Sequence, residues 1–436
     1  MFFDAKNPNK GTDMAFLRLE SNNPNFTFLI RKNPASGMLI KKLRHGTVFG
    51  FYSKNNASQY NCWFKDHNSL ISYDPGKPFE YNDTTRYSAA LFTNHCCDEF
   101  FRDLQLKNLS EDTEGFHHSL LINCIHAKEK YVEIFSGAFR DFQWDIMPLA
   151  QGHYRIKLGT DGTLRRLLCF ASLFSLINAI PNGECEQYDD GLLVKYAKLI
   201  QYLDAPYFVR YVFKVNLIRR EATFGKLKPY LNTDSIQLIP GNNFFHRMQF
   251  VAQNLDGRTI IDIGCGEGKY MRYAKKVDHY YAVERDESRR AAAERKCRKD
   301  QLENVTVLAS PDELPQIDGR KTILLSEVIE HNSRDDALAL LKRCLLPDSR
   351  VIVTTPNRDF NVYYEDGADH DESEGNPAES DVWFRHEDHQ FELTEQEFRE
   401  FIAAATAEIK CNVKFSAIGD KVDGISPQSG VVIDVQ

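Results

Sequence analysis

The sequence lacks the features that mark secreted, membrane-spanning and zinc-cysteine proteins. Its ten cysteines include no Cys-x-x-Cys pair, and their spacing shows no disulfide framework, so we expect reduced and mostly buried thiols. The opening residues, MFFDAKNPNKGTD, contain no signal-peptide apolar core. The most apolar run, LLCFASLFSLINAI (167–180), is too short to span a bilayer and is interrupted by polar residues. These absences predict a soluble, cytoplasmic protein that binds no membrane.

The sequence also lacks an excess of basic residues. Lysine and arginine number 54 against 62 aspartates and glutamates, which gives a net charge of −8. Proteins that coat long nucleic acids through bulk charge are usually basic. If this protein binds nucleic acid, we expect it to grip a small feature locally. A length of 436 residues with 42% hydrophobic content allows two or three domains with real cores.

The first half of the chain predicts an α+β domain, residues 1–240. Strands are expected at FTFLIRK (26–32), MLIKKL (38–43), TVFGFYS (47–53), YNCWFK (60–65) and SLLINCIHA (119–127). Helical spacing covers residues 87–106 and then dominates after Gly162, at 164–180, 191–203 and 206–218. Strands therefore precede helices in this half.

The second half, residues 241–436, predicts an α/β domain with a Rossmann-like, doubly wound parallel sheet. A turn-rich break, QLIPGNNFF, precedes it and favours a linker or the start of a helix. Strand and helix then alternate, as in open parallel sheets. The five expected strands are RTIIDIG (258–264), HYYAVE (279–284), VTVLAS (305–310), TILLSE (322–327) and RVIVTTP (350–356).

A glycine-rich turn, DIGCGEG (262–268), follows the first of these strands. Gly264 and Gly266 permit a tight turn and close approach of a ligand to the backbone. Glu284 ends the next strand, where a carboxylate can accept hydrogen bonds from the ribose hydroxyls of a nucleotide-like cofactor. A structural turn without a cofactor is the alternative.

S-adenosylmethionine fits this turn better than NAD does. The spacing departs from the dinucleotide G-x-G-x-x-G pattern, and the carboxylates of Asp262 and Glu267 would repel a pyrophosphate. A sulfonium-bearing amino acid would not be repelled. Asp312, after the third strand, is a candidate for the adenine amino group, with a helix cap as its alternative role.

Glu327, Glu330 and His331 lie within five positions at the end of the fourth strand. In open α/β sheets this edge is where ligands bind. Two carboxylates and an imidazole can hold Mg²⁺ or Mn²⁺. A solvated helix start, where acidic residues suit the helix dipole, explains the same triplet without a metal.

A second cluster, RHEDHQFEL (385–393), follows the fifth strand and is expected to return to the same edge. Its histidines are three residues apart. One can complete the coordination of a metal, and another can act as a base. Surface histidines at a helix cap are the alternative.

Three stretches carry a resemblance to a known family. SEVIEH (326–331), TPNRDFN (355–361) and RHEDHQFELTEQEF (385–398) resemble the motif set of the RNA 3′-terminal 2′-O-methyltransferases of the HEN family. DIGCGEGKY fits that family's cofactor motif, and the resemblance covers residues 243–416. SEVIEH alone is similar to a motif of quinone O-methyltransferases, whereas RHEDHQFEL separates the two families.

The resemblance implies roles for individual residues. The implied ligands of Mg²⁺ or Mn²⁺ are Glu327, Glu330, His331 and His389. The implied contacts of S-adenosylmethionine are Asp262, Gly264, Gly266, Glu284 and Ser326. Arg385 and His386 would line the RNA 3′ end, with His386 as the candidate base and His389 or His331 as alternatives. One cation that binds the 2′- and 3′-hydroxyls would both activate the nucleophile and select a free RNA end.

The first half resembles the amino-terminal region of the bacterial HEN members, in the order of YNDTTRYSAALFTNHCCDEFF, LRRLLCFASLFSLINAI and the helix that follows. In those proteins the region activates the ligase of a polynucleotide kinase–phosphatase partner. The resemblance therefore implies a hetero-oligomer that acts in RNA repair. Three departures stand out: Leu393 replaces the family's usual tryptophan, the acidic segment 365–381 looks like an insertion, and the stretch before SEVIEH looks shortened.

Two other functions compete with this prediction. A quinone-type small-molecule O-methyltransferase would share the glycine turn and SEVIEH, but would need neither RHEDHQFEL nor a large first domain. A non-catalytic activating subunit would use the first half alone, which contains no convincing catalytic constellation. Methyl incorporation into oligoribonucleotide against catechol, and a ligation assay, discriminate among the three.

Overall fold

The computed structural model describes residues 16–42, 46–66, 90–149, 152–181, 189–365 and 388–436. The chain divides into two compact units, Met1–Leu231 and Asn232–Gln436. The boundary expected from sequence, at residue 240, falls shortly after this division. Within the described residues, none of the helices combines the length and the apolar character that a bilayer crossing requires.

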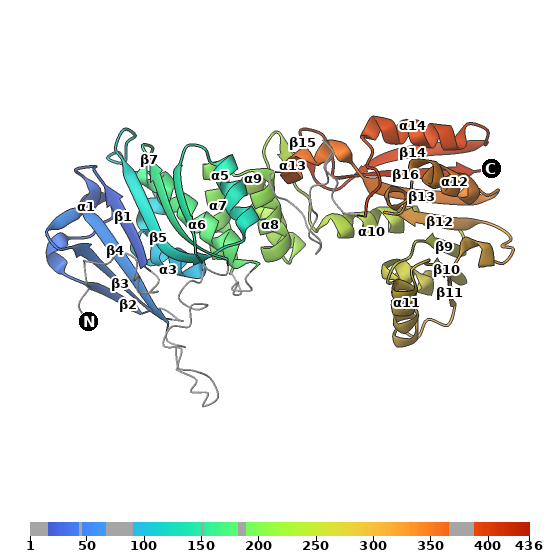
Figure 1. Ribbon diagram of the computed structural model, residues 1–436, viewed down its shortest axis with the longest axis horizontal. Coiled ribbons are helices and arrows are strands. Elements are labelled where there is room, and N and C mark those ends of the chain that lie inside the picture. The colour runs from blue at the N-terminus through green and yellow to red at the C-terminus, as the bar shows by residue number, and fades with distance from the viewer. Residues whose placement is uncertain (1–15, 43–45, 67–89, 150–151, 182–188, 366–387) are drawn as a thin grey trace, which may run out of the picture. The chain divides into compact units, whose positions relative to one another are not determined.

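The first unit is built on a seven-stranded antiparallel sheet of order β2-β3-β4-β1-β5-β7-β6 (Figure 1). The strands are β1 (Phe16–Ser21), β2 (Leu39–Lys42), β3 (Gly46–Ser53), β4 (Asn56–Asp66), β5 (His118–His126), β6 (Gln143–Pro148) and β7 (His153–Thr160). The helices are α1 (Phe26–Leu29), η1 (Pro34–Ser36), α3 (Ala90–Phe100), α4 (Arg102–Leu106), α5 (Glu129–Ala138), α6 (Leu164–Ala179), α7 (Asp190–Leu203), α8 (Tyr207–Leu217) and α9 (Glu221–Leu231).

Helix α6 forms the centre of this unit because it is buried on nearly every side. All but two of its residues are buried, including Ser172 and Ser175. Thr163 caps its first turn by accepting a hydrogen bond from the backbone N–H of Arg166. A helix that is hydrophobic all round belongs in a core, and α6 contacts α3, α4, α7, α8 and strands of the sheet.

One expected strand of this unit is wrong. FTFLIRK contains helix α1, because Phe26 and Leu29, three positions apart, are both buried and one helical turn brings them to the same side. The sheet instead takes its first strand from FLRLES, β1, whose alternating burial had the period-two pattern of a strand. The other four expected strands of this half are confirmed as β2, β3, β4 and β5.

The second unit has a seven-stranded sheet of order β11-β10-β9-β12-β13-β16-β14. The first five strands in this order are parallel to one another, β16 is antiparallel to β13, and β14 is antiparallel to β16 and so runs in the direction of the first five. Its strands are β9 (Thr259–Ile263), β10 (His279–Val283), β11 (Val305–Leu308), β12 (Lys321–Ser326), β13 (Ser349–Pro356), β14 (Cys411–Ile418) and β16 (Gln428–Val435). Two short strands, β8 (Ile236–Gln237) and β15 (Lys421–Val422), pair with each other in a separate sheet. The expected Rossmann-like sheet is confirmed, with two further strands that were not expected, β16 and β14, of which only β16 runs against the others.

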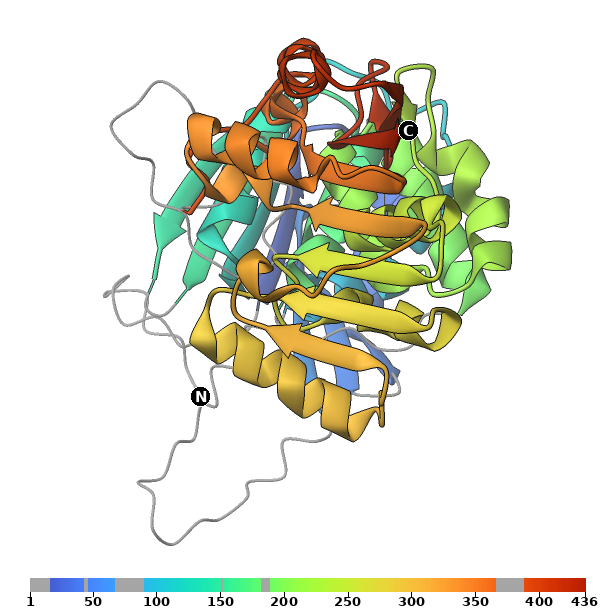
Figure 2. The same cartoon turned by 90° about the vertical axis from the view of Figure 1, so that its right-hand side faces the viewer.

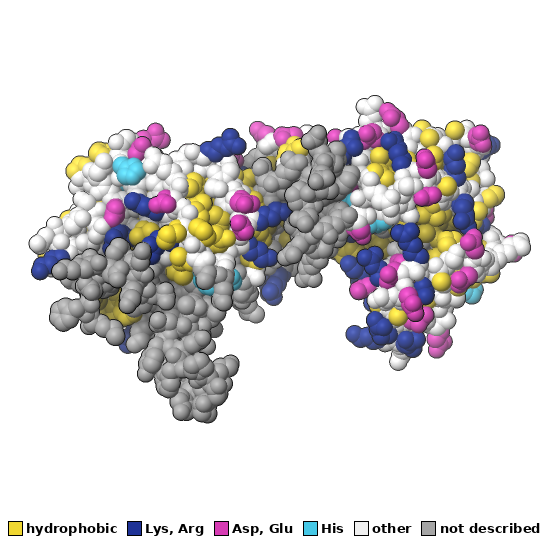
Figure 3. Space-filling view, viewed as in Figure 1, with side chains coloured by type: hydrophobic (Ala, Val, Ile, Leu, Met, Phe, Trp, Pro, Cys, Tyr) yellow, Lys and Arg dark blue, Asp and Glu magenta, His cyan; other side chains and the backbone are white. Residues whose placement is uncertain are grey.

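Helices cover both faces of this sheet (Figure 2). Residues of α10, η2 and α11 pack on one face, and residues of α12 and α14 pack on the other. The helices are α10 (Asn243–Asn254), η2 (Lys269–Lys276), α11 (Glu287–Lys299), η3 (Pro311–Glu313), η4 (Ile329–His331), α12 (Arg334–Cys344), η5 (Arg358–Phe360), α13 (Val362–Glu365) and α14 (Glu395–Thr406). On the face of this unit seen in Figure 3, basic and acidic side chains are interspersed.

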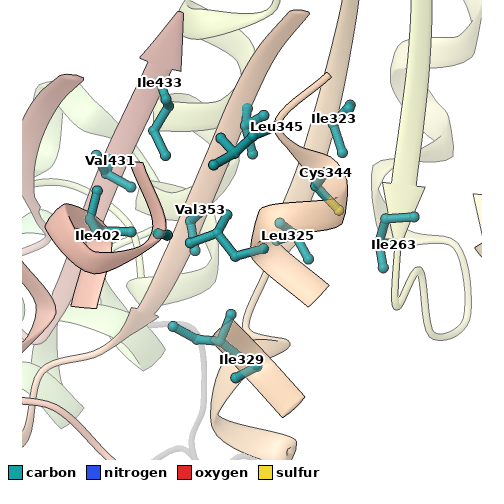
Figure 4. Packing of buried hydrophobic residues seen from close by; sticks show 14 of the residues in the cluster. Ile263, Ile323, Leu325, Ile329, Cys344, Leu345, Val353, Ile402, Val431 and Ile433 are labelled. Atoms are coloured by element: carbon teal, nitrogen blue, oxygen red, sulfur yellow. The ribbon is translucent and has the colours of Figure 1, made fainter. Parts of the chain in front are cut away.

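The core between the sheet, α12 and α14 also fixes the short helix η4. Ile329 of η4 is fully buried in the cluster that contains Leu325, Val353 and Ile402 (Figure 4). Burying an isoleucine side chain contributes about 1.5–3 kcal/mol. The residue is therefore a hydrophobic anchor directly before Glu330 and His331, at the edge where the parallel strands end.

Candidate active site

The glycine turn after β9 has the backbone that its sequence predicts. Gly264, Gly266 and Gly268 have φ of 70°, 54° and 78°, which is the left-handed region that glycine adopts without strain. A Cβ on Gly264 would lie 2.8 Å from a methyl group of Val328. The turn therefore lies close against the loop that follows β12.

Glu284 binds to this turn through its carboxylate. Its Oε2 accepts a hydrogen bond from the backbone N–H of Gly266 at 2.8 Å, and its Oε1 accepts one from that of Asp286 at 2.9 Å. Each carboxylate oxygen has a further lone pair. The buried carboxylate thus stands at the end of β10, beside the turn, where the sequence predicts a contact with a ribose.

Asp262 is buried beneath the turn. Its Oδ2 accepts a hydrogen bond from the Tyr280 hydroxyl at 2.6 Å. Burial raises the pKa of its carboxyl to about 7; the Tyr280 hydrogen bond opposes this shift, and the nearby charge of Glu284 adds to it. A cationic ligand next to Asp262 would favour its ionised form.

The remaining expected cofactor contacts, Ser326 and Asp312, differ in their surroundings. Ser326 lies at the end of β12, with its hydroxyl 2.8 Å from that of Tyr270 and 2.9 Å from that of Thr354. Asp312 is exposed and binds the guanidinium of Arg343 at 2.6 Å. Ser310, not Asp312, caps the short helix η3. Asp312 therefore does not cap this helix.

Glu330, His331 and His389 come together at the carboxyl end of the sheet. Each offers one ligand atom, and these atoms lie within 4.8 Å of one another. The segment around His389 is bound to η4, because the backbone N–H of Gln390 donates to the carbonyl of Glu330 at 2.8 Å. Residues almost sixty positions apart in sequence thus form one group, as the sheet-edge rule predicts.

The surroundings of Glu330 fit a cation. Its side chain is 0% exposed, and its Oε2 accepts a hydrogen bond from Thr355 at 3.2 Å. Within the described ranges, its Oε1 has no hydrogen-bond partner. Burial, followed by the charge of Glu327, raises the pKa of this carboxyl well above its ordinary value. A divalent metal can be bound by two imidazoles together with a buried carboxylate whose second oxygen accepts no hydrogen bond from the described residues.

Glu327 has other partners and is not in this group of three. Arg247 of α10 donates to its Oε2 at 2.6 Å, and Thr354 donates to its Oε1 at 3.1 Å. Its φ of 56° is unusual for a residue with a side chain, and such backbone strain tends to occur at functional sites. Its expected role as a metal ligand stays a prediction.

Arg385 and His386, expected at the RNA terminus, lie outside the described residues. Leu393, where the HEN family usually has tryptophan, is buried in the core between the sheet and α14. Its carbonyl accepts a hydrogen bond from the backbone N–H of Arg358 at 2.9 Å. The smaller side chain is thus accommodated in the packing of this unit.

Sequence reasoning missed two residues that contact the site, Arg247 and Glu392. Glu392 is buried, and its Oε1 lies 2.6 Å from Nδ1 of His389. The spacing His389-x-x-Glu392 was a usable signal, since metal-binding histidines usually donate to a carboxylate. Arg247 had no such signal, because its α10 lies some eighty residues before its partner Glu327.

Two family models match this chain. The family model described as "Hen1 N-terminal domain" matches residues 16–235, just over half of the chain. The chain belongs to the Hen1 family. A second model, described as "Methyltransferase domain", matches residues 242–406, so the second unit of this Hen1 protein is a methyltransferase domain. Domains of this kind take S-adenosylmethionine as the methyl donor.

A solved structure supports the same placement over the whole chain. It is described as the Pnkp1/Rnl/Hen1 RNA repair complex, and one of its chains superposes with a TM-score of 0.76 at 26% identity. The match covers 96% of this chain and 100% of that one. The resemblance noted from the sequence motifs is therefore confirmed at the level of family and fold.

Two curated proteins named "Small RNA 2′-O-methyltransferase" match shorter segments. The protein from Arabidopsis thaliana is 25% identical over 177 residues, which are 37% of this chain and 19% of its own length. The protein from Tetrahymena thermophila is 37% identical over 79 residues, 18% of this chain and 16% of its own length. The chain thus matches less than a fifth of the length of either relative.

Proposed function

We propose that this Hen1 protein transfers a methyl group from S-adenosylmethionine to the 2′-hydroxyl of the 3′-terminal ribose of RNA, with a divalent cation at the site. The observation that carries the proposal is the convergence of Glu330, His331 and His389 within 4.8 Å. This group lies at the same sheet edge as the glycine turn and Glu284. The names of the two curated relatives support the choice of reaction.

The cation would be held by Glu330, His331 and His389, with Glu327 as a further candidate. When bound, Mg²⁺ or Mn²⁺ lowers the pKa of a coordinated hydroxyl group, which makes a ribose hydroxyl a better nucleophile at neutral pH. The protein's own contribution is to hold these side chains in place before substrate arrives. Thr355 orients Glu330, and Ile329 fixes the backbone of η4 in the core.

The methyl donor would lie along the glycine turn, from Gly264 and Gly266 towards Glu284. Glu284 would accept hydrogen bonds from the ribose of the cofactor, and Ser326 would lie near the methionine end. Asp262 supports the turn from below and favours a ligand of positive charge. Asp312 stays a candidate for the adenine amino group if its ion pair with Arg343 opens.

The substrate would be an RNA end with adjacent 2′- and 3′-hydroxyls. An internal nucleotide has no free 3′-hydroxyl, and DNA has no 2′-hydroxyl, so a site that requires both groups selects RNA 3′ ends. Arg385 and His386 would line this end, with His386 as the candidate base. Their chemistry suits the task, since arginine binds phosphate and histidine accepts protons near neutral pH.

We also propose that the first unit binds a polynucleotide kinase–phosphatase partner and activates the RNA ligase of that partner. The two proteins would form a hetero-oligomeric repair complex. The solved Pnkp1/Rnl/Hen1 complex supports this assignment. The test is a ligation assay of the partner with and without the full chain. An unchanged ligation rate would contradict activation and leave methyl transfer unaffected.

The decisive test of methyl transfer uses a defined oligoribonucleotide, S-adenosylmethionine and Mn²⁺. Nuclease digestion and mass analysis should place one methyl group on the terminal ribose. Oligonucleotides that end in a 3′-phosphate or a 2′-deoxynucleotide, and reactions with a chelator, should show none. Transfer to either blocked end would contradict recognition of both hydroxyls, and transfer to catechol would favour the quinone-type alternative.

A further inference from the structure

The buried carboxylate of Glu392 contacts the metal-site histidine from behind. Its side chain is 1% exposed. One oxygen lies 2.6 Å from Nδ1 of His389, and the other accepts a hydrogen bond from the side-chain amide of Asn361 at 2.6 Å. An ionised carboxylate can only accept hydrogen bonds. An ionised Glu392 thus places the proton of a neutral His389 imidazole on Nδ1 and leaves the lone pair on Nε2.

The neighbouring histidine is held in the same way. Nδ1 of His331 lies 3.2 Å from a carboxylate oxygen of Asp388. The two imidazole rings have centroids 4.8 Å apart and planes at 77°. The short segment Asp388–Glu392 thus provides one histidine of the group and a carboxylate for each of the two histidines.

Glu392 also connects this segment to the loop after β13. Asn361, its second partner, follows helix η5 in TPNRDFN, and both side chains are buried. A fully buried carboxylate carries a desolvation cost, whereas glutamine would fill the same space at lower cost. What the carboxylate adds is negative charge next to an imidazole, which makes Nε2 a stronger ligand.

We propose that Glu392 is a positioning residue that holds His389 with Nε2 towards Glu330 and His331, and so sets the affinity of the site for a divalent cation. The inference rests on the proposed function, because it concerns the same cation. It assigns to Glu392 no contact with RNA or with S-adenosylmethionine.

The experiment is calorimetric titration of the full chain with Mn²⁺ in the absence of RNA. The Glu392→Gln variant keeps the shape and one acceptor but loses the charge, and we expect its Kd for Mn²⁺ to rise about 10–100-fold. Its affinity for S-adenosylmethionine should stay unchanged, and a higher Mn²⁺ concentration should restore its methyl transfer. Glu400→Gln, an exposed position on α14, is the matched control and should bind Mn²⁺ like the unmodified protein.

The outcomes separate this inference from the proposed function. If the unmodified protein binds no Mn²⁺, the metal-dependent function fails. If it binds Mn²⁺ and Glu392→Gln binds equally well, the positioning role is overturned and the function stands. A lower Tm with an unchanged Kd would likewise show a purely structural role.

A second variant decides the matter if Glu392→Gln does not fold. Asn361→Ala leaves the contact between Glu392 and His389 but removes a donor that orients the carboxylate. We expect a smaller increase of the Kd for Mn²⁺ than for Glu392→Gln, again with unchanged affinity for S-adenosylmethionine. A folded Asn361→Ala protein with an unchanged Kd for Mn²⁺ would overturn the inference in that case.

Discussion

At the scale of single residues, Glu330 combines complete burial with an oxygen that has no partner among the described residues. We expect Glu330→Gln to reduce methyl transfer to RNA at least about 100-fold, the upper range for outer-shell partners of a metal. Because a buried carboxylate costs free energy when ionised, the variant should be no less stable than the unmodified protein without metal.

Radiolabel transfer and calorimetry with S-adenosylmethionine check this division of roles. Cofactor affinity should survive in Glu330→Gln, since the glycine turn and Glu284 are untouched. A variant that loses cofactor affinity together with activity would place Glu330 in the cofactor site instead. Thr355→Val, which removes only the hydrogen bond to Oε2, should have a smaller effect on transfer.

Asp262 leads to a prediction about pH. Burial raises the pKa of its carboxyl in the folded protein to about 7, compared with about 3.9 in an unfolded chain. The folded state therefore holds the proton more tightly, and its stability declines as the pH rises from about 4 to about 7. Asp262→Asn removes this loss while an amide oxygen can still accept the Tyr280 hydrogen bond.

We expect Asp262→Asn to unfold at a higher temperature than the unmodified protein at pH 8, without cofactor. The gain corresponds to roughly 2–4 kcal/mol, and the difference should shrink towards pH 4. Thermal unfolding at several pH values measures it. A variant that is less stable at pH 8 would show that Asp262 is ionised and stabilising in the folded state.

At the scale of elements, the glycine turn that follows β9 packs against the loop after β12. Gly264→Ala would put a methyl group 2.8 Å from Val328 on a backbone with φ of 70°. We expect a loss of about 1–3 kcal/mol in the free energy of unfolding and a clearly weaker affinity for S-adenosylmethionine. Both are measurable, by thermal unfolding and by calorimetry.

Gly319→Ala is a matched control for the backbone. Its φ is 75°, but a Cβ there would have nothing within 4 Å. This variant should have a lower free energy of unfolding because of its left-handed backbone, but its affinity for S-adenosylmethionine should be unchanged. Equal cofactor affinities in Gly264→Ala and Gly319→Ala would contradict a role of the Gly264–Val328 contact in the site.

The elements also show what sequence patterns can predict. The five parallel strands were predictable because each is a short apolar run between turn signals, and the alternation with helices fixed their class. Strands β14 and β16 were not predicted, because they follow α14 as an antiparallel pair that breaks this alternation. FTFLIRK was misassigned because a short apolar run does not distinguish one helical turn from a strand.

Within the site, the meeting of His389 with Glu330 and His331 followed from chain topology alone. The ion pair of Arg247 with Glu327 did not, since no local pattern links α10 to the end of β12. Glu392 lies in the stretch RHEDHQFEL, yet its role depends on burial and on Asn361, which are visible only in the folded chain. Sequence thus predicts positions along strands better than contacts between side chains.

At the scale of the whole molecule, the charge distribution bears on RNA binding. The net charge is −8, and the second unit mixes both signs over the face seen in Figure 3. We therefore expect few phosphate contacts. In a plot of log Kd for single-stranded RNA against log KCl concentration, the slope should be below about 2. Such a slope corresponds to fewer than about three phosphate contacts.

Fluorescence anisotropy of an end-labelled RNA between roughly 50 and 200 mM KCl measures this slope. RNAs of different length with the same 3′ end should bind with similar affinity, because recognition is local. A steep slope, or affinity that grows with length, would indicate an extended basic track along the protein and contradict terminal recognition.

Strand β13 is paired with β12 on one side and with β16 on the other, over most of its length. Its amide hydrogens should consequently be among the slowest in the chain to exchange with deuterium. The backbone leaves the sheet directly after Pro356, in the loop that leads to Asn361. Protection should continue past the end of the strand, because the amides of Asn357 and Arg358 donate to the carbonyls of Pro427 and Leu393 at 3.0 and 2.9 Å. The loop that carries Asn361 should therefore exchange almost as slowly as the strand that it leaves.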